Sequence, residues 1–305
     1  MARQKSPVAF VLSGGAGLGA IQVGMLRALY ERGIAPDLLV ATSAGAINGA
    51  FIATREQTID TADELAEIWQ HVRRSQVFPL NPLTGLLGFI GTRAHLVPAS
   101  GLRRLVSEHL DAMQLGNLPI ALHVVAVDVI TGEELLLSSG PLLDAVIASA
   151  SIPAVLPPVR WEDRELMDGG VANNTPISHA IALGAREIYV LPTGHACALE
   201  RPPGSALGMA LHALSLLTHS RLIADIELHR HDAKLIVMPP PCPLSITPID
   251  FGRAEELIER STHESRAFLE DGGADRPAIR MHMHRHAQTG VRTRARASLR
   301  QHATS

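Results

Sequence analysis

A glycine-rich segment near the N-terminus has the residue types needed to hold a negatively charged oxygen. It reads Ser13-Gly-Gly-Ala-Gly-Leu-Gly19 and lies between a short apolar run and a segment with helical periodicity. Because glycine has no side chain in the way, several backbone N–H groups can surround one anion, and the dipole of the following helix adds to the attraction. Two anions fit this description: the pyrophosphate of a dinucleotide, or the oxyanion of a tetrahedral intermediate in acyl transfer.

Ser43 lies in a second segment, which could supply a nucleophile. The sequence Ala41-Thr-Ser-Ala-Gly45 resembles G-x-S-x-G, the elbow that exposes a serine at a sharp strand-to-helix turn, with Ala41 in place of the first glycine. A serine between small residues is also typical of an ordinary helix N-cap. The upstream glycine loop favours the nucleophile, since both segments follow strands of one parallel sheet and should meet at its carboxyl edge.

A serine hydroxyl is a weak nucleophile and needs a base, for which Asp168 is the best candidate. It lies in Leu166-Met-Asp-Gly-Gly-Val-Ala-Asn-Asn-Thr-Pro176, where the paired glycines free the backbone to bring a carboxylate close to another loop. An ordinary D-G turn is the alternative interpretation. Among 15 histidines, His179 and His195 are the nearest rivals, but they fit a helix and a loop after a strand more simply.

A dinucleotide site is the alternative interpretation of the glycine loop. Gly15, Gly17 and Ala20 satisfy the loose G-x-G-x-x-G/A pattern. Such a site also needs an acid at the end of the second strand, about 20 residues on, to hold the ribose. Asp37 comes before the apolar run Leu38–Val40, at the wrong end of that strand. A Rossmann-like nucleotide-binding protein is therefore the less favoured class.

An α/β fold must position these segments. Apolar runs bounded by Gly, Pro or Asn alternate with segments of helical periodicity, which predicts βαβ units of a mostly parallel sheet. We expect strands at 8–12, 38–41, 122–128 and 187–191, and helices at 20–32, 44–54, 60–73, 101–110, 141–149 and 176–183. Thr131-Gly132 predicts a hairpin turn between antiparallel strands.

Two segments do not fit this alternation of strands and helices. The stretch 78–98 is too apolar for an ordinary surface loop and too interrupted by Pro and Gly for a long helix, so it predicts a cover over the core or a lipid-facing flap. Its apolar side chains are candidates for substrate binding: Leu83, Leu86, Leu87, Phe89 and Ile90. Between Leu207 and Leu228 a helical pattern predicts a core helix, or alternatively a membrane-facing one, with a stripe formed by Leu207, Leu211, Leu214, Leu217 and Leu222.

The composition limits the remaining possibilities. With 305 residues, 46% of them hydrophobic, the chain can form one large α/β domain, expected over 1–275. A formal charge of −3 argues against nucleic acid as a partner. Two cysteines and no apolar stretch of about 18 residues predict a cytoplasmic protein whose membrane contact, if any, is peripheral. The stretch 276–305 is basic and predicts a disordered tail, and its alternating histidines at 282, 284 and 286 are not expected to bind a metal.

Together the three motifs resemble the patatin-like phospholipase family, over about 8–191. The likeness extends to Gly19-Ala-Ile-Gln-Val-Gly-Met-Leu26 and to Ala148-Ser-Ala-Ser-Ile-Pro153. It implies a three-layer α/β/α sandwich with a mostly parallel central sheet, and a serine acyl hydrolase that cleaves fatty-acyl esters of lipids without cofactor or metal. Phospholipid, lysophospholipid and neutral glyceride stay open as substrates.

Carried over residue by residue, the resemblance implies that Ser43 is the nucleophile, Asp168 the general base, and the backbone of Gly14, Gly15, Ala16 and Gly17 the oxyanion hole. The chain departs from the family pattern at three positions. Ala16 replaces a third glycine, Leu18 stands where Arg or Lys is frequent, and Ala41 replaces the first glycine of the elbow. Because of the first two departures, a family member that binds acyl lipids without turnover stays an alternative interpretation.

Overall fold

A mostly parallel sheet forms the centre of the molecule. The computed structural model describes residues 6–79, 95–194, 202, 204, 206–242, 244 and 246–276. The sheet has eight strands in the order β5-β6-β3-β2-β1-β7-β8, with β4 also paired to β3. Neighbours from β3 to β8 are parallel, whereas β4, β5 and β6 pair antiparallel. The strands are β1 (Val8–Leu12), β2 (Leu38–Thr42), β3 (Ala121–Asp128), β4 (Glu134–Leu137), β5 (Val159–Trp161), β6 (Arg164–Asp168), β7 (Glu187–Leu191) and β8 (Lys234–Val237).

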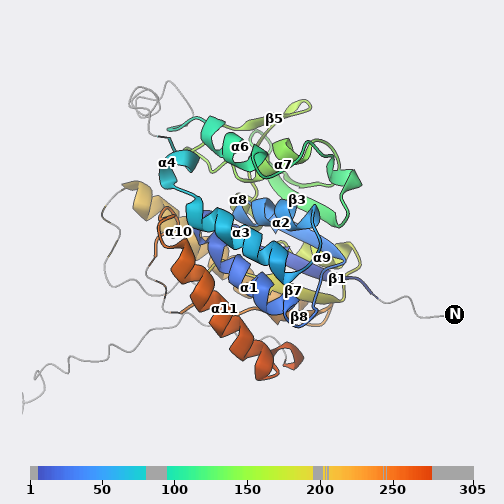
Figure 1. Ribbon diagram of the computed structural model, residues 1–305. Helices are drawn as coiled ribbons and strands as arrows, with labels where there is room; N and C mark the ends of the chain where they lie inside the picture. Colours follow the sequence, from blue (N-terminus) through green and yellow to red (C-terminus); the bar gives the residue numbers. More distant parts are fainter. Residues whose placement is uncertain are drawn as a thin grey trace, which may run out of the picture.

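Helices cover both faces of this sheet (Figure 1). They are α1 (Ala20–Tyr30), α2 (Ala44–Ala53), α3 (Ile59–His71), α4 (Arg74–Val77), α6 (Ser100–Ser107), α7 (Leu142–Ser149), α8 (Gly170–Asn173), α9 (Ile177–Ala182), α10 (Ala206–His229) and α11 (Ala254–Glu270). Alternate side chains of β1 point to opposite faces, as the strand period requires. Phe10 and Leu12 pack in a core shared with α1, α2 and α11, while Ala9 and Val11 pack against α9 and α10. The predicted three-layer α/β/α sandwich is confirmed.

All four expected strands and all six expected helices lie within three residues of their predicted ends. The hairpin turn at Thr131-Gly132 is also confirmed, since β3 and β4 pair antiparallel and Gly132 has φ +73°. Strands β5, β6 and β8 and helix α11 were not among the expected elements. Helix α11 packs so closely on α1 that a Cβ at Gly24 would lie 2.5 Å from the backbone oxygen of Ile258.

The stripe predicted for the helix between Leu207 and Leu228 is wrong for Leu217. This side chain is 68% exposed, whereas Leu222 is buried against the sheet. The reason is geometric: residues five apart lie about 140° apart around a helix and cannot share a buried face. No helix in the described part of the chain is both long and apolar enough to span a bilayer. The substrate-binding candidates Leu83, Leu86, Leu87, Phe89 and Ile90, like His195 and the tail after residue 276, lie outside the described residues.

Candidate active site

Two strand ends meet beside β3 and bring Ser43 and Asp168 together. Strand β2 runs parallel to β3 and ends with Thr42 opposite Val125. Strand β6 runs antiparallel and ends with Asp168 opposite Ala126, the next residue of β3. Because β4 occupies the other edge of β3 over the same residues, β2 and β6 lie on one side and their ends face each other. The residue after β2 therefore lies next to the last residue of β6.

Ser43 occupies a strained turn between β2 and α2. Its φ of 54° and ψ of −122° lie in a region that costs a residue with a Cβ about 1–3 kcal/mol. The Ser43 N–H donates to the Ser149 hydroxyl at 2.8 Å, which in turn donates to the Val125 carbonyl at 2.6 Å. Gly45 is needed for the tight turn, since a Cβ there would lie 2.3 Å from the carbonyl oxygen of Leu12. This is the geometry of a nucleophile elbow.

The side chains of Ser43 and Asp168 form a short hydrogen bond. The Ser43 hydroxyl donates to Asp168 Oδ2 at 2.6 Å, and the N–H of Gly170 donates to Oδ1 at 2.7 Å. Both side chains are buried. Burial raises the pKa of Asp168 from 3.8 to about 6, although the hydrogen bonds from Ser43 and Gly170 oppose this rise. The carboxylate is thus a stronger base than an exposed aspartate, and it is aimed at the hydroxyl.

The glycine loop lies against Ser43, since a Cβ at Gly14 would lie 2.9 Å from the Cβ of Ser43. Gly14 and Gly17 donate their N–H groups to the carbonyls of Asn174 at 3.2 Å and Pro248 at 2.8 Å. Within the described residues, no backbone acceptor is found for the N–H of Gly15 or of Ala16. Ala16 has φ 48°, a conformation that glycine adopts with less strain than alanine.

Polar side chains hold the glycine loop from behind. The carbonyl of Gly14 accepts from the Thr193 hydroxyl at 2.6 Å and from Asn174 Nδ2 at 3.3 Å. Since the carbonyl of Gly14 and the N–H of Gly15 belong to one peptide group, these bonds fix its plane and polarise the N–H. Gln22 Nε2 donates to the carbonyls of Ser13 and Leu191, each at 2.9 Å. The loop is therefore pre-organised.

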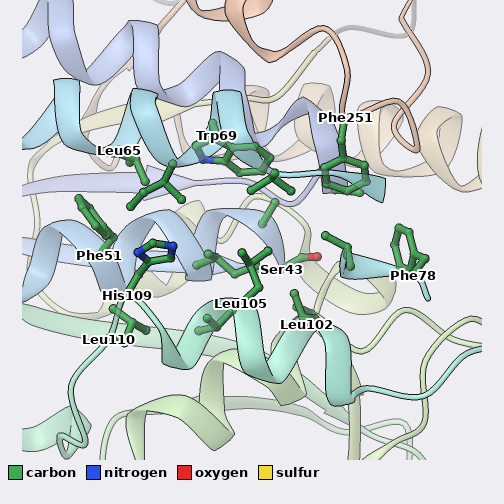
Figure 2. A pocket seen from close by; sticks show the side chains of 18 of the residues that line it. Ser43, Phe51, Leu65, Trp69, Phe78, Leu102, Leu105, His109, Leu110 and Phe251 are labelled. Carbon is green, nitrogen blue, oxygen red and sulfur yellow. The ribbon is translucent and has the colours of Figure 1, made fainter. Parts of the chain in front are cut away.

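An apolar pocket opens at Ser43 between α2, α3 and α6 (Figure 2). Apart from Ser43, its one polar lining residue in the described part of the chain is His109. In Figure 2 the imidazole lies beside Phe51 and Leu110, at one end of the pocket. The Ser43 hydroxyl is bonded to Asp168, so His109 does not serve it as a base in this arrangement. A long apolar substrate group fits such a lining.

The rival interpretations of the sequence find less support in the geometry. Asp37 Oδ2 accepts from the N–H of Val8 at 2.7 Å, which places Asp37 at the start of β1, away from the glycine loop at its end. His179 is bonded to Glu134 at 2.5 Å. Within the described residues, no three side chains of His, Cys, Asp or Glu are grouped as a metal site.

Sequence reasoning missed the supporting residues and the pocket. Gln22 and Ser149 lie in segments that belong to the family likeness, so that likeness was a usable signal for them. Asn174 lies in the segment around Asp168 but was given no role of its own, and Thr193 carried no comparable signal. The pocket side chains are ordinary apolar residues of amphipathic helices, and their sequence pattern does not separate them from core residues.

Part of the chain is similar in sequence to known proteins. A family model described as patatin-like phospholipase matches residues 10–181. The chain is 30% identical over 192 residues to patatin-like phospholipase domain-containing protein 7 of Mus musculus, covering 61% of this chain and 14% of that protein. It is 31% identical over 172 residues to an uncharacterised NTE family protein of Mycobacterium tuberculosis, covering 54% of this chain and 27% of that one. The chain thus spans about a quarter or less of the length of these relatives.

Solved structures with similar folds are more distant in sequence. VipD from Legionella pneumophila aligns with a TM-score of 0.42 and 14% identity, covering 86% of this chain and 67% of that one. Human GIVD cytosolic phospholipase A2, in complex with methyl gamma-linolenyl fluorophosphonate, aligns with a TM-score of 0.42 and 13% identity, covering 88% of this chain and 58% of that one.

Proposed function

Since the chain belongs to the patatin-like phospholipase family, we propose that it is a serine acyl hydrolase that cleaves fatty-acyl esters of lipids with a Ser43/Asp168 dyad. The observation that carries the proposal is the 2.6 Å hydrogen bond to Asp168 from the hydroxyl of Ser43, which lines an apolar pocket. The test is hydrolysis of p-nitrophenyl octanoate by the purified chain. We expect saturable release of p-nitrophenol, and a rate no higher than that of buffer would contradict the proposal.

The proposed reaction proceeds in two steps. Asp168 accepts the proton of Ser43 while the serine oxygen attacks the acyl carbonyl, and the alcohol leaves with a proton from Asp168. Water then attacks the acyl-enzyme, again with Asp168 as base, and the fatty acid is released as Ser43 regains its proton. The pKa of about 6 suits both roles, because the carboxylate is ionised near neutrality yet basic enough to hold a proton briefly.

The oxyanion of each tetrahedral intermediate would be held by the glycine loop. The backbone of Gly14, Gly15, Ala16 and Gly17 was expected to supply the donors. We narrow this proposal to the N–H groups of Gly15 and Ala16, because Gly14 and Gly17 already donate to protein carbonyls. The start of the turn Ala16–Gly19 adds partial positive charge near the same point.

The rate of hydrolysis is expected to depend on the ionisation of Asp168. The base must be unprotonated, and burial raises its pKa to about 6. We therefore expect kcat/KM to be constant above about pH 7 and to fall about tenfold per pH unit below about pH 5. The measurement is a pH profile with p-nitrophenyl octanoate. A plateau that extends unchanged down to pH 4 would contradict a base whose pKa is raised to about 6.

A side chain at Gly15 is expected to damage the oxyanion hole. A Cβ there would lie 2.2 Å from Thr193 Oγ1, so Gly15→Ala must displace the loop or the Thr193 side chain that bonds to it. Loss of one oxyanion donor typically costs about 10²–10³-fold in kcat. Steady-state kinetics should show that loss. The control is Gly116→Ala, whose Cβ would meet its nearest neighbour at an ordinary 3.9 Å, and it should keep wild-type kcat.

The physiological partner in this proposal is a lipid surface reached by peripheral contact. Exposed apolar side chains on α10 support it, among them Met209, Leu216 and Leu217. The alternative, a family member that binds acyl lipids without turnover, shares the pocket but does not need a base. A chain that binds octanoate and never releases p-nitrophenol would favour that alternative.

A further inference from the structure

The pocket extends along helix α2 on one side of Ser43. Figure 2 shows Phe51, Leu65, His109 and Leu110 on one side of the nucleophile, and Phe78 and Phe251 on the other. We call the first side the α2 arm, formed by Ile47, Phe51, Leu65, His109 and Leu110. All of its lining side chains belong to the described part of the chain.

Helix α2 gives the α2 arm a defined length. Ser43 precedes the first residue of α2, and Ala44, Ile47 and Phe51 line the pocket at the spacing of one helix face. At 1.5 Å per residue, Phe51 lies about 12 Å along the axis from Ser43. An extended chain advances about 1.2 Å per bond, so this distance corresponds to about ten bonds.

Arg55 fixes the ring of Phe51 at the end of the α2 arm. Its guanidinium carbon lies 3.7 Å from the centroid of that ring. The same guanidinium donates to the backbone oxygen of His109 at 3.2 Å and pairs with Glu64 at 3.4 Å. It therefore joins α2, α3 and the segment after α6 behind one buried aromatic ring. The bonds to His109 and Glu64 hold the guanidinium in place, and moving the Phe51 ring would break its contact with that guanidinium.

We propose that the α2 arm measures the acyl chain, and that Phe51 limits the preferred substrates to esters of straight chains of about eight to ten carbons. The proposal rests on the proposed acyl hydrolase function and adds its chain-length class. A longer chain must bend back towards Ser43 or displace Phe51, whereas a shorter one leaves apolar lining uncovered. A longer and a shorter acyl chain are therefore each stabilised less in the α2 arm than a chain of matching length.

The test is kcat/KM on straight-chain p-nitrophenyl esters from butanoate to hexadecanoate, at one surfactant concentration. We expect a maximum at octanoate or decanoate for the wild type. Phe51→Ala should move the maximum to longer esters. The ratio of kcat/KM for the tetradecanoate ester to kcat/KM for the octanoate ester should rise at least about tenfold. Ile47→Phe places a ring about one turn from Ser43 and should move the maximum to butanoate or hexanoate.

The matched control is Phe78→Ala, the same truncation on the other side of Ser43. It should leave the maximum at the wild-type chain length. A thermal melt of each variant establishes folding. If Phe51→Ala does not fold, Ile47→Phe alone tests whether the α2 arm sets the preferred chain length. An active wild type with no maximum, or equal shifts in Phe51→Ala and Phe78→Ala, overturns the chain-length proposal alone. A wild type that hydrolyses no ester overturns the proposed function as well.

Discussion

Replacing Asp168 by asparagine is expected to abolish ester hydrolysis and at the same time to stabilise the fold at neutral pH. An amide cannot accept the Ser43 proton, so kcat should fall by about 10⁶-fold, the scale seen when the base of a serine hydrolase is removed. Burial raises the pKa of Asp168 from 3.8 to about 6, which corresponds to about 3 kcal/mol against the ionised form. Asparagine has no charge to bury.

The pH dependence of this stabilisation has a defined sign. Below the unfolded pKa of 3.8 the carboxyl is neutral in both states, so the two proteins should have similar free energies of unfolding. The wild type loses stability as the pH rises towards 6, and above that the variant should be more stable by up to about 3 kcal/mol. Urea unfolding at pH 4 and pH 7.5 measures this difference. A variant that is less stable at pH 7.5 would favour the alternative in which Asp168 only shapes a turn.

Asp128→Asn is the matched control because its pKa is shifted the other way. The Asp128 carboxylate accepts from the N–H groups of Ile130 at 2.8 Å and Thr131 at 3.0 Å. The Thr131 N–H bond is the main reason that its pKa is lowered. The stability it contributes is present above the unfolded pKa and is lost as the pH falls, so Asp128→Asn should destabilise the protein at neutral pH.

Ser43→Ala is expected to lower kcat for ester hydrolysis by about 10⁴-fold or more while leaving the pocket intact. The methyl group keeps the turn and fills the same position, but it has no oxygen to attack the carbonyl. Asp168 loses a hydrogen bond that lowers its pKa, so that pKa should rise further. Steady-state hydrolysis of p-nitrophenyl octanoate measures the loss, and binding of octanoate should persist.

The control for this variant is another buried serine. Ser261 is buried and donates to the backbone oxygen of Ile21 at 2.7 Å, on the core side of α11. Ser261→Ala should cost about 1 kcal/mol of stability, the typical value of one hydrogen bond, and should keep wild-type activity. Equal loss of activity in both serine variants would trace the effect to folding instead of chemistry.

The sequence was sufficient for the parallel core and for the principal pair. Strands β1, β2, β3 and β7 are continuous apolar runs because helices cover both their faces, and this pattern is local. The glycines after Asp168 were expected to free the backbone and bring the carboxylate close to another loop. Asp168 Oδ2 accepts from the hydroxyl of Ser43, in the turn after β2, and a Cβ at Gly169 would lie 2.3 Å from the carbonyl oxygen of Val125.

The features that could not be predicted depend on contacts between distant segments. Strand β6 has mixed burial and little apolar periodicity, and its place beside β3 is set by pairing of residues about 40 apart in sequence. The support of Gly14 by Thr193 needs the ends of β1 and β7 to be adjacent, which follows only from the strand order. Helix α11 carries many charges, and its apolar positions have meaning only once α1 is in place.

Covalent labelling tests the central claim most directly. An alkyl fluorophosphonate reacts when an activated serine oxygen attacks phosphorus and fluoride leaves, and the glycine loop should hold the phosphoryl oxygen as it would an oxyanion. Peptide mapping by mass spectrometry should find one adduct, on Ser43, formed at least about 10²-fold more slowly in Asp168→Asn. An adduct on a different residue that stops hydrolysis, or continued hydrolysis with Ser43 fully modified, would contradict the account.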